Sequence, residues 1–277
     1  MDVIHSVQQL RERLSPEHPV ALVPTMGNLH DGHIDLIRLA RPHATCLVTS
    51  LFVNRLQFGP GEDYERYPRT LAADCQRLQQ AGCDVVFAPD EAEVYPVPQS
   101  VTVEPSRIQN TLEGQVRPGH FRGVATVVLK LFNMVQPQLA IFGKKDYQQY
   151  LVLREMVQQL ALPIKIIPAE TVRAPDGLAL SSRNSYLSPL ERIESIALYH
   201  QLDQIRKFLF AGRRDFGSLE VEASEALDRR GWETDYFAIR RRCDLQEVGP
   251  QDRALVVLAA ARLGKTRLID NVEVDLS

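Results

Sequence analysis

Two histidines three residues apart follow a short apolar segment near the start of the chain. His30 and His33 lie in the stretch VALVPTMGNLHDGH, whose residues 20–23 have the continuous apolar pattern of a buried strand. Two imidazoles with this spacing, at a helix start just past the carboxyl end of a strand, can converge on one anion. Gly27 and Gly32 leave room for a phosphate, which the leading amides of the helix favour. The segment therefore predicts a phosphate site in which imidazole N–H donors stabilise negative charge.

Two side-chain amides follow the next predicted strand, residues 46–53. Asn54 and Gln57 occur in the stretch SLFVNRLQF, and we expect them at the same sheet edge as His33. A buried amide can donate and accept hydrogen bonds together. That property suits hydroxyl groups and a carboxylate that must remain nucleophilic, so this segment predicts a site for a small polar acid.

A third segment, QPQLAIFGKKDYQQ, combines a predicted strand with basic and amide side chains. The strand ends at Gly143, and Lys144, Lys145 and Asp146 follow at the start of the next helix. Lysine at a strand end suits a phosphate, and Asp146 suits a ribose hydroxyl or the helix cap. Gln149, one helical turn further on, is placed to face the acid.

A fourth segment lies later in the chain and reads Leu180-Ser181-Ser182-Arg183-Asn184. Two hydroxyl groups followed by an arginine can clamp phosphate oxygens, and the guanidinium can offer two parallel hydrogen bonds as pyrophosphate leaves. Because the segment stands where one domain is expected to give way to the next, domain closure there would exclude water from a hydrolysable intermediate.

Each segment also has a plainer interpretation. Histidines commonly cap helices or lie on the surface, and a single glutamine is usually a surface or packing amide. A lysine pair is often a solvated charge pair, Asp146 fits a simple N-cap, and residues 180–184 fit a polar turn. The paired histidines in a strand-to-helix turn, and the repeated placement of polar groups after strands, favour the chemical interpretation.

The elements that must position these residues follow a regular alternation over residues 19–169. Predicted strands cover residues 20–23, 46–53, 85–88, 139–142 and 164–167, and predicted helices cover residues 33–40, 71–81, 124–135 and 147–160. This β-α-β-α pattern predicts an α/β fold, with a parallel sheet and flanking helices. Ligands of such folds collect at the carboxyl ends of the strands.

The pattern changes near residue 172. A hairpin-like excursion is predicted at residues 172–180, around the turn Pro175-Asp176-Gly177. Ser188-Pro189-Leu190-Glu191 is a capping box that predicts a helix to about residue 209. A second helix is predicted at residues 218–230, and strands at residues 236–239, 254–260 and 267–274. We expect residues 1–175 to form one domain and residues 176–277 a smaller α+β domain that acts as a lid.

The bulk composition is that of an ordinary folded protein. Hydrophobic residues make up 44% and charged residues 24% of the 277 residues, and the formal net charge is -3. This charge attracts neither nucleic acid nor an acidic membrane, so phosphate binding must be local. Cys46, Cys75, Cys83 and Cys243 lack the spacing of zinc ligands, which favours reduced thiols in the cytoplasm and no structural metal. Residues 1–14 lack the basic start and apolar run of a signal peptide, and the longest apolar run, residues 254–261, is too short to cross a bilayer, so we expect neither export nor membrane spanning.

Five motifs together resemble the signature set of the pantothenate synthetase family. They are PTMGNLHDGH, FVNRLQF with the downstream YPRT, GHFRGVATVV, FGKKDYQQ and DGLALSSRN, and they occur in the family's order between residues 20 and 184. TRLIDN, near Arg267, resembles the family's carboxyl end. The first motif is shared with the wider adenylyl-transferring superfamily, which includes the class I aminoacyl-tRNA synthetases. The glutamines and the FRG element separate this family from those relatives.

The resemblance implies a cytoplasmic homodimer with a Rossmann-like first domain that binds ATP and pantoate. The implied enzyme is an AMP-forming ligase: the carboxylate of pantoate attacks the α-phosphate of ATP, and β-alanine then displaces AMP from pantoyl adenylate. Mg²⁺ accompanies the phosphates of ATP.

The resemblance also implies roles for individual residues. The implied catalytic residues are His33, usually described as a proton donor, with His30, Lys145 and Arg183. Gln57 matches the ligand of both pantoate and β-alanine, and Gln149 matches the second pantoate ligand. The implied ATP contacts are Met26, Gly27, Asn28, Leu29, His30, Asp31, Gly32, His33, Gly143, Lys144, Lys145, Asp146, Val172, Leu180, Ser181, Ser182 and Arg183.

Two positions depart from the family pattern. Arg55 stands where proline is common, and Lys144 stands where an acidic residue is common. Arg55 gives the loop before Gln57 more freedom, because the fixed φ of proline is lost. Lys144 adds positive charge near the expected ATP site.

Two other functions fit parts of the sequence. A nucleotidyltransferase would move AMP onto a phosphate ester and keep it in the product, and it would need more cations around the acceptor. A nucleotide-sensing or RNA-binding module would use the basic cluster at residues 240–242, but no stacking aromatic side chains are interleaved with it.

Overall fold

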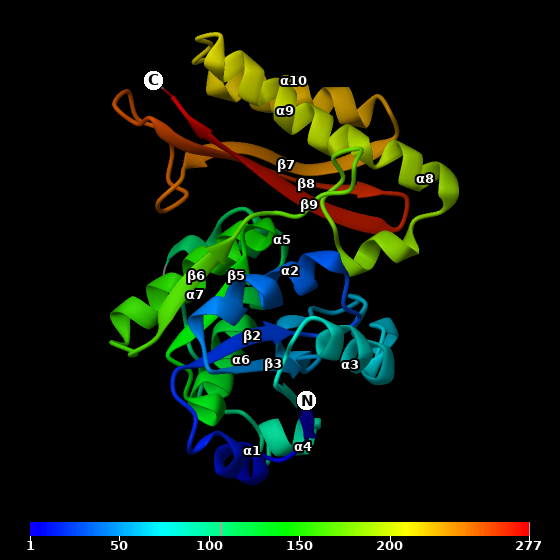
Figure 1. Cartoon of the computed structure of the whole chain (residues 1–277). Coiled ribbons are helices and arrows are strands. Elements are labelled where there is room, and N and C mark those ends of the chain that lie inside the picture. Colours follow the sequence, from blue (N-terminus) through cyan, green and yellow to red (C-terminus); the bar gives the residue numbers. More distant parts are fainter. Residues whose placement is uncertain (106, 277) are drawn as a thin grey trace.

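The first part of the chain forms a six-stranded parallel sheet. The computed structural model describes residues 1–105 and 107–276 (Figure 1). The strands are β1 (Asp2–Ile4), β2 (Val20–Thr25), β3 (Cys46–Leu51), β4 (Val85–Phe87), β5 (Leu139–Gly143) and β6 (Lys165–Ala169). Their order is β1-β4-β3-β2-β5-β6, and all neighbours are parallel. In this order, β3 lies on one side of β2 and β5 lies on the other, so the direction in which the chain adds strands reverses at β2. Such a reversal opens a crevice at the carboxyl ends of the two central strands.

Helices cover both faces of this sheet. They are α1 (Val7–Leu14), α2 (Asp31–Ala40), α3 (Leu71–Gln80), α4 (Glu91–Val94), α5 (Glu113–Val116), α6 (His120–Val135) and α7 (Tyr147–Gln159). Side chains alternate along β2: Val20 and Leu22 join the core under α1, α6 and α7, whereas Ala21 and Val23 join the core under α2 and α3. This burial on two faces explains the continuous apolar run of the strand. In the described part of the chain, every helix falls short of the length and hydrophobicity that crossing a bilayer requires.

The last third of the chain forms a second, antiparallel sheet. Its strands are β7 (Trp232–Arg241), β8 (Ala254–Leu263) and β9 (Thr266–Asp275), in that order, and its helices are α8 (Pro189–Glu194), α9 (Ile196–Phe210) and α10 (Phe216–Asp228). Leu255 and Val257 of β8 pack with residues of α9 and α10, whereas Val256 and Leu258 pack with Tyr147 on α7. The sheet is therefore buried between its own helices and the first unit, as Figure 1 shows.

These two sheets confirm the predicted fold class, a parallel α/β sheet followed by a smaller α+β unit. The hairpin-like excursion is present as one antiparallel bridge between Arg173 and Ala179. The predicted helix from residue 188 to residue 209 is wrong in one respect, because it is two helices that meet at Ser195. The Ser195 hydroxyl donates to the backbone carbonyl of Arg192 at 2.7 Å, a local bond of the kind that bends helices. The capping box of Ser188 and Glu191 is formed as expected.

A buried ion pair joins the two units. Arg173 donates to both carboxylate oxygens of Asp270, at 2.6 and 2.9 Å, and the side chain of Asp270 is only 3% exposed. The Arg173 guanidinium also lies over the ring of Tyr199, 4.2 Å from its centroid. Next to this pair, the Asn271 amide donates to the backbone carbonyls of Lys144 and Lys145. The second sheet thus binds the backbone of the turn that follows β5.

Replacing Arg173 with methionine should lower the free energy of unfolding by about 3–5 kcal/mol, because it leaves the Asp270 carboxylate buried and unpaired. Arg192→Met is the control, since the Arg192–Asp176 pair is 37% and 40% exposed and such pairs contribute about 0–1 kcal/mol. Urea unfolding followed by circular dichroism measures both. Equal losses in the two variants would show that the buried pair does not hold the units together.

Candidate active site

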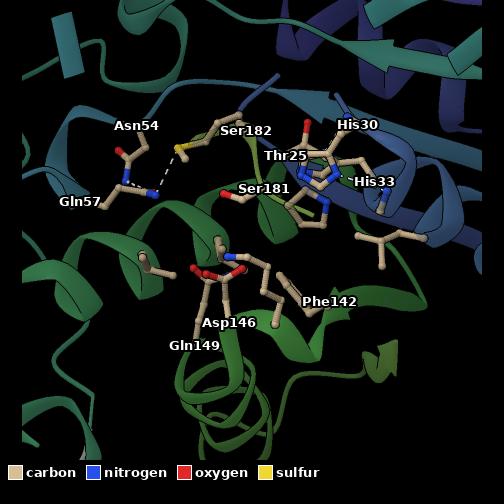
Figure 2. A pocket seen from close by; sticks show the side chains of 18 of the residues that line it. Thr25, His30, His33, Asn54, Gln57, Phe142, Asp146, Gln149, Ser181 and Ser182 are labelled. Carbon is tan, nitrogen blue, oxygen red and sulfur yellow. Dashed lines mark hydrogen bonds between the residues drawn. The ribbon is translucent and has the colours of Figure 1, made fainter. Parts of the chain in front are cut away.

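A cavity of about 230 Å³ lies where β2, β3 and β5 end, next to the segment that leads into the second unit. Figure 2 shows polar side chains from these separate segments pointing into it. The predicted site residues that line it are Met26, His30, Gly32, His33, Gln57, Gly143, Lys145, Asp146, Gln149, Val172, Leu180, Ser181, Ser182 and Arg183. The four segments selected from the sequence therefore meet at one place.

The remaining predicted ATP contacts, Gly27, Asn28, Leu29, Asp31 and Lys144, surround the cavity instead of forming its wall. Gly27 adopts a positive φ of 83°, a backbone conformation that favours glycine over other residues. Leu29 is buried in the core under α2, and Asp31 pairs with Arg77. Gly27, Asn28, Leu29 and Asp31 belong to the loop and helix start that carry the histidines, whereas Lys144 follows β5. Direct contact of these five residues with ATP stays a prediction.

The Asp74 carboxylate on α3 holds this loop through hydrogen bonds to its backbone. It accepts the backbone N–H of Asn28 at 3.0 Å and that of Leu29 at 2.8 Å. It also accepts the hydroxyl of Thr70 at 3.0 Å and is 3% exposed. Hydrogen bonds to a buried carboxylate are strong. Asp74 therefore orients the segment before His30, although nothing in the sequence pattern singled it out.

The two histidines cap α2 in an unusual way. The Nδ1 atom of His30 accepts the backbone N–H of Gly32 at 3.2 Å, and the Nδ1 atom of His33 accepts the backbone N–H of His30 at 3.3 Å. The ring centroids lie 4.0 Å apart. Because each Nδ1 is an acceptor, each neutral ring carries its proton on Nε2. Two N–H donors are thus available to one ligand.

The electrostatic environment keeps both rings neutral. Loss of hydration, with the nearby Lys145 cation, lowers the pKa of His30 to about 4. Loss of hydration, followed by the influence of His30 and Lys145, lowers the pKa of His33 to about 3. In the free protein, the pair therefore donates hydrogen bonds without carrying charge. This state differs from the proton donor that the family resemblance implies for His33, which stays a prediction.

A chain of amides orients Gln57, which lies in a short 3-10 turn, η2 (Arg55–Gln57), after β3. The Tyr95 hydroxyl donates to Asn54 Oδ1 at 2.7 Å, and Asn54 Nδ2 donates to the Gly123 carbonyl at 3.2 Å and to Gln57 Oε1 at 3.0 Å. The remaining amide end of Gln57, Nε2, contacts Met26 Sδ at 3.3 Å and lies at the cavity (Figure 2). Gln57 therefore presents an N–H donor to a ligand.

The start of α6 supports the same turn through the motif GHFRG. His120 Nδ1 donates to the Gln57 carbonyl at 2.8 Å, and burial with the adjacent Arg117 lowers the pKa of His120 to about 4. Gly123 lies against the turn so closely that a Cβ atom there would stand 2.1 Å from the Leu56 carbonyl oxygen. Gly123 is therefore needed for α6 and this turn to pack together.

The cations of the site are not equivalent. Lys144 Nζ bonds to Glu170 at 2.5 Å and to Glu273 at 3.0 Å, so its charge is used between the two units. Lys145 lines the cavity and, among the described residues, makes no ion pair. Arg183 is held by Asp63 through two bonds of 3.1 and 2.9 Å. Lys145 is therefore the cation most readily available to an anionic ligand.

One face of α6 gives the cavity an apolar wall. Its side chains lie three or four residues apart, and Phe52 and Phe142 extend the wall; the α6 residues are Val124, Val127, Val128 and Leu131. Figure 2 shows the imidazoles of His30 and His33 on one side of the cavity and the Gln57 amide on the other. Such a separation suits a ligand with an anionic part and a small branched acid part.

No group of three or more histidine, cysteine or carboxylate side chains among the described residues is arranged to hold a metal ion. A divalent ion that enters with a nucleotide would take its ligands mainly from phosphate oxygens and water.

The comparison with known proteins decides the family. The sequence profile for pantoate-beta-alanine ligase matches residues 2–273. The chain belongs to the pantoate–β-alanine ligase family. This assignment confirms the resemblance drawn from the five motifs and makes the chain an ATP-using ligase.

Relatives of this ligase match it over nearly its whole length. A pantothenate synthetase from Nitrosospira multiformis is 58% identical over 274 residues, which are 99% of this chain and 98% of that protein. The crystal structure of pantothenate synthetase from Thermus thermophilus has a TM-score of 0.94 at 44% identity, covering 98% of this chain and 99% of that chain. A pantoate-beta-alanine ligase from Francisella tularensis has a TM-score of 0.83 at 34% identity, covering 98% and 97%, and its structure is described as complexed with beta-gamma ATP and beta-alanine. The predicted fold is confirmed by these structures.

Sequence reasoning missed several residues of the ligase site. Thr25, Arg117 and His120 line the cavity, and Asp74 and Tyr95 act through other residues. The motif GHFRG did mark the region of His120, but no role followed from its letters. For Asp74, an acidic residue in the first turn of a helix is too common a pattern to reveal its role.

The three histidines of the site should remain neutral in the folded, ligand-free protein as the pH falls from 8 to about 5. Their pKa values lie below the ordinary value, so the unfolded chain binds more protons between about 4 and 6.5, and folding stability falls as the pH falls through that window. Side-chain NMR of His30, His33 and His120 measures the titration, with the urea-unfolded chain as reference near 6.5. Midpoints near 6.5 in the folded protein would contradict this electrostatic picture.

Proposed function

We propose that the cavity joins pantoate to β-alanine with ATP in two steps, through pantoyl adenylate, and releases AMP and pyrophosphate. One observation carries this proposal. Two neutral imidazole donors lie on one side of the cavity and the fixed Gln57 amide lies on the other, and Lys145, a serine-arginine segment and an apolar face of α6 line the same cavity. These groups match the two halves of an acyl adenylate.

ATP binds at the cationic end in this proposal. The Nε2–H groups of His30 and His33 donate to the α-phosphate, and Lys145 binds the outer phosphates. Ser181 and Ser182 line the same end and add hydroxyl donors. Mg²⁺ enters as part of the ATP complex, held mainly by phosphate oxygens and water.

Pantoate binds at the other end. Its hydroxyl groups and carboxylate face the amides of Gln57 and Gln149, and its two methyl groups lie on the apolar face of α6. Neutral amides hold the carboxylate without neutralising it, so the acid stays nucleophilic. The chain from Tyr95 through Asn54 fixes which end of the Gln57 amide faces the substrate.

In the first step, a carboxylate oxygen of pantoate attacks the α-phosphorus and the bond to the bridging oxygen of pyrophosphate breaks. Negative charge on the phosphate oxygens increases, and the preorganised imidazole donors bind this charge more strongly than they bind ATP itself. Lys145 and Arg183 stabilise the pyrophosphate that leaves, once Arg183 exchanges Asp63 for phosphate oxygens.

In the second step, the amine of β-alanine attacks the acyl carbon, the bond to AMP breaks, and the amine gives up a proton to solvent. Water would destroy the adenylate, so the site must be closed. We propose that residues 176–277 act as the lid, because residues 172–183 connect the second unit directly to the cavity. We further propose that the chain works as a homodimer in the cytoplasm, where ATP is available.

Product analysis tests this proposal. The chain is incubated with ATP, Mg²⁺ and pantoate, with and without β-alanine, and AMP, pyrophosphate and pantothenate are measured by mass spectrometry. The proposal requires pantothenate and one AMP per turnover only when both acids are present. AMP that stays attached to the acceptor would favour nucleotidyl transfer, and ATP binding without turnover would favour a sensor.

His33→Ala should reduce the rate of adenylate formation about a hundredfold or more while the protein stays folded, because it removes one donor to the α-phosphate. His200→Ala, on the exposed surface of α9, serves as the matched control. Single-turnover pyrophosphate release measures the rate, and circular dichroism checks the fold. Turnover of His33→Ala close to that of the unaltered protein would remove His33 from the mechanism.

A further inference from the structure

The second acid substrate presents a recognition problem that the residues considered so far leave open. β-Alanine keeps its carboxylate throughout the proposed reaction, so the site must bind this anion while the amine at the other end of the molecule attacks. In the proposed function, Lys145 and Arg183 are occupied by the phosphates of ATP. A different cation is therefore needed near Gln57, where the acyl group lies.

Arg117 is the cation beside Gln57. Its Nη2 atom lies 3.3 Å from the Gln57 carbonyl oxygen, and its side chain lines the cavity and is 14% exposed. It follows α5 and stands at the entrance to α6, the helix that forms the apolar wall for the acid. Arg117 is thus close to Gln57 and largely shielded from solvent.

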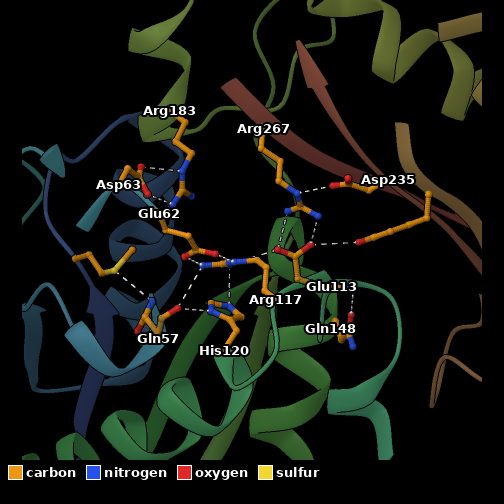
Figure 3. Close-up of polar contacts among 12 residues, drawn as sticks. Gln57, Glu62, Asp63, Glu113, Arg117, His120, Gln148, Arg183, Asp235 and Arg267 are labelled. Carbon is orange, nitrogen blue, oxygen red and sulfur yellow. Dashed lines mark hydrogen bonds and ion pairs between the residues drawn. The ribbon is translucent and has the colours of Figure 1, made fainter. Parts of the chain in front are cut away.

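Figure 3 shows that the guanidinium of Arg117 already holds a carboxylate, that of Glu62. Nε donates to Oε1 at 2.7 Å and Nη2 donates to Oε2 at 2.6 Å, which is the two-point geometry that arginine forms with free carboxylates. Burial acts to raise the pKa of Glu62, but Arg117 outweighs it and holds the pKa below its ordinary value. Glu62 is therefore an ionised carboxylate at neutral pH.

Other contacts hold Arg117 in place through its remaining nitrogen. Nη1 contacts His120 Nε2 at 3.2 Å and Glu113 Oε1 at 3.3 Å. Glu113 also accepts two bonds from Arg267, at 2.8 and 2.9 Å, and Arg267 in turn pairs with Asp235. Without Glu62, the Nε and Nη2 atoms of Arg117 would lose their carboxylate partner and could bind another one.

Glu62 lies on a loop that can give up this position more easily than a helix or strand. The loop joins η2 to the next 3-10 turn, η3 (Tyr64–Arg66), and contains Gly59, Pro60 and Gly61 before Glu62. Its side chain is 25% exposed, so water can solvate the carboxylate once it leaves Arg117. A substrate carboxylate of the same geometry can then take its place.

We propose that Arg117 binds the carboxylate of β-alanine and that Glu62 occupies this binding position in the free protein. This inference rests on the proposed function. The two methylene groups of β-alanine then place its amine near the Gln57 side chain, where the acyl carbon of pantoyl adenylate lies. Arg117 is thus a specificity-determining residue for the second substrate, and it takes no part in the formation of the adenylate.

Arg117→Gln should raise the KM for β-alanine on the order of 100-fold, because a buried charge-assisted contact is lost. Pyrophosphate release from ATP and pantoate alone should change far less than this KM, because the side chains assigned to ATP and pantoate are retained. The variant should also lose the preference for β-alanine over β-alaninamide, an amine of the same length without the anionic group. Glu62→Gln should have the opposite effect and lower the KM for β-alanine several-fold, because the internal competitor is weakened.

Glu194→Gln is the matched control for Glu62→Gln. Glu194 also accepts two bonds from one arginine, Arg230, and its side chain is 27% exposed, but it is the last residue of α8, in the second unit. Its loss should leave the KM for β-alanine unchanged. If the KM for β-alanine falls in both glutamate variants, the effect comes from a general change in stability, and the proposal is overturned.

Arg117→Lys separates recognition from structure, because lysine keeps the charge but lacks the two-point fork. Loss of pyrophosphate release in both Arg117 variants would make Arg117 a structural residue and overturn the proposal. An unchanged KM and an unchanged preference over β-alaninamide in Arg117→Gln would overturn it as well. A wrong proposed function would give a different result, because the unaltered protein itself would then release no pyrophosphate with ATP and pantoate.

Discussion

The backbone of the first turn of α2 sets the chemistry of the whole site. The N–H groups of His30 and Gly32 donate to imidazole Nδ1 atoms, so both rings must carry their protons on Nε2. A histidine pair that would otherwise be free to titrate becomes a fixed pair of neutral donors. The parallel sheet supplies the frame for this arrangement, because the reversal between β2 and β5 brings the helix start opposite Lys145. Asp74 below the loop completes the frame by holding the preceding residues.

Two arginines around the cavity share a common arrangement. Arg117 and Arg183 are each held by a carboxylate from neighbouring positions of one loop, Glu62 and Asp63. Figure 3 shows both pairs on the same side of the site. In both, an anionic substrate group has the shape and charge to replace the protein carboxylate. The loop can therefore keep the cations oriented in the free protein, and binding exchanges one ion pair for another instead of burying a bare charge.

Local sequence patterns were enough to predict the strands and most of the helices, because continuous apolar runs and 3.6-residue periodicity report burial directly. They were also enough to place His33, Gln57 and Lys145 at one sheet edge and Arg183 at the junction to the second domain. They failed where the decisive contact joins distant segments. The direction of Lys144, for example, depends on Glu273, more than a hundred residues away, which turns its charge from the nucleotide end toward the second sheet. Asp74 was missed for the same reason, since its partners are backbone N–H groups of another segment.

The proposed chemistry requires that one oxygen of pantoate becomes bonded to the α-phosphorus of ATP. Pantoate labelled with ¹⁸O in its carboxylate tests this requirement most directly, through the mass of the AMP formed in the presence of β-alanine. An acyl adenylate predicts that each AMP acquires one labelled oxygen, while the other labelled oxygen stays in the amide carbonyl of pantothenate. AMP that contains no ¹⁸O, with the label found in inorganic phosphate or pyrophosphate, would contradict the acyl adenylate and the roles derived from it.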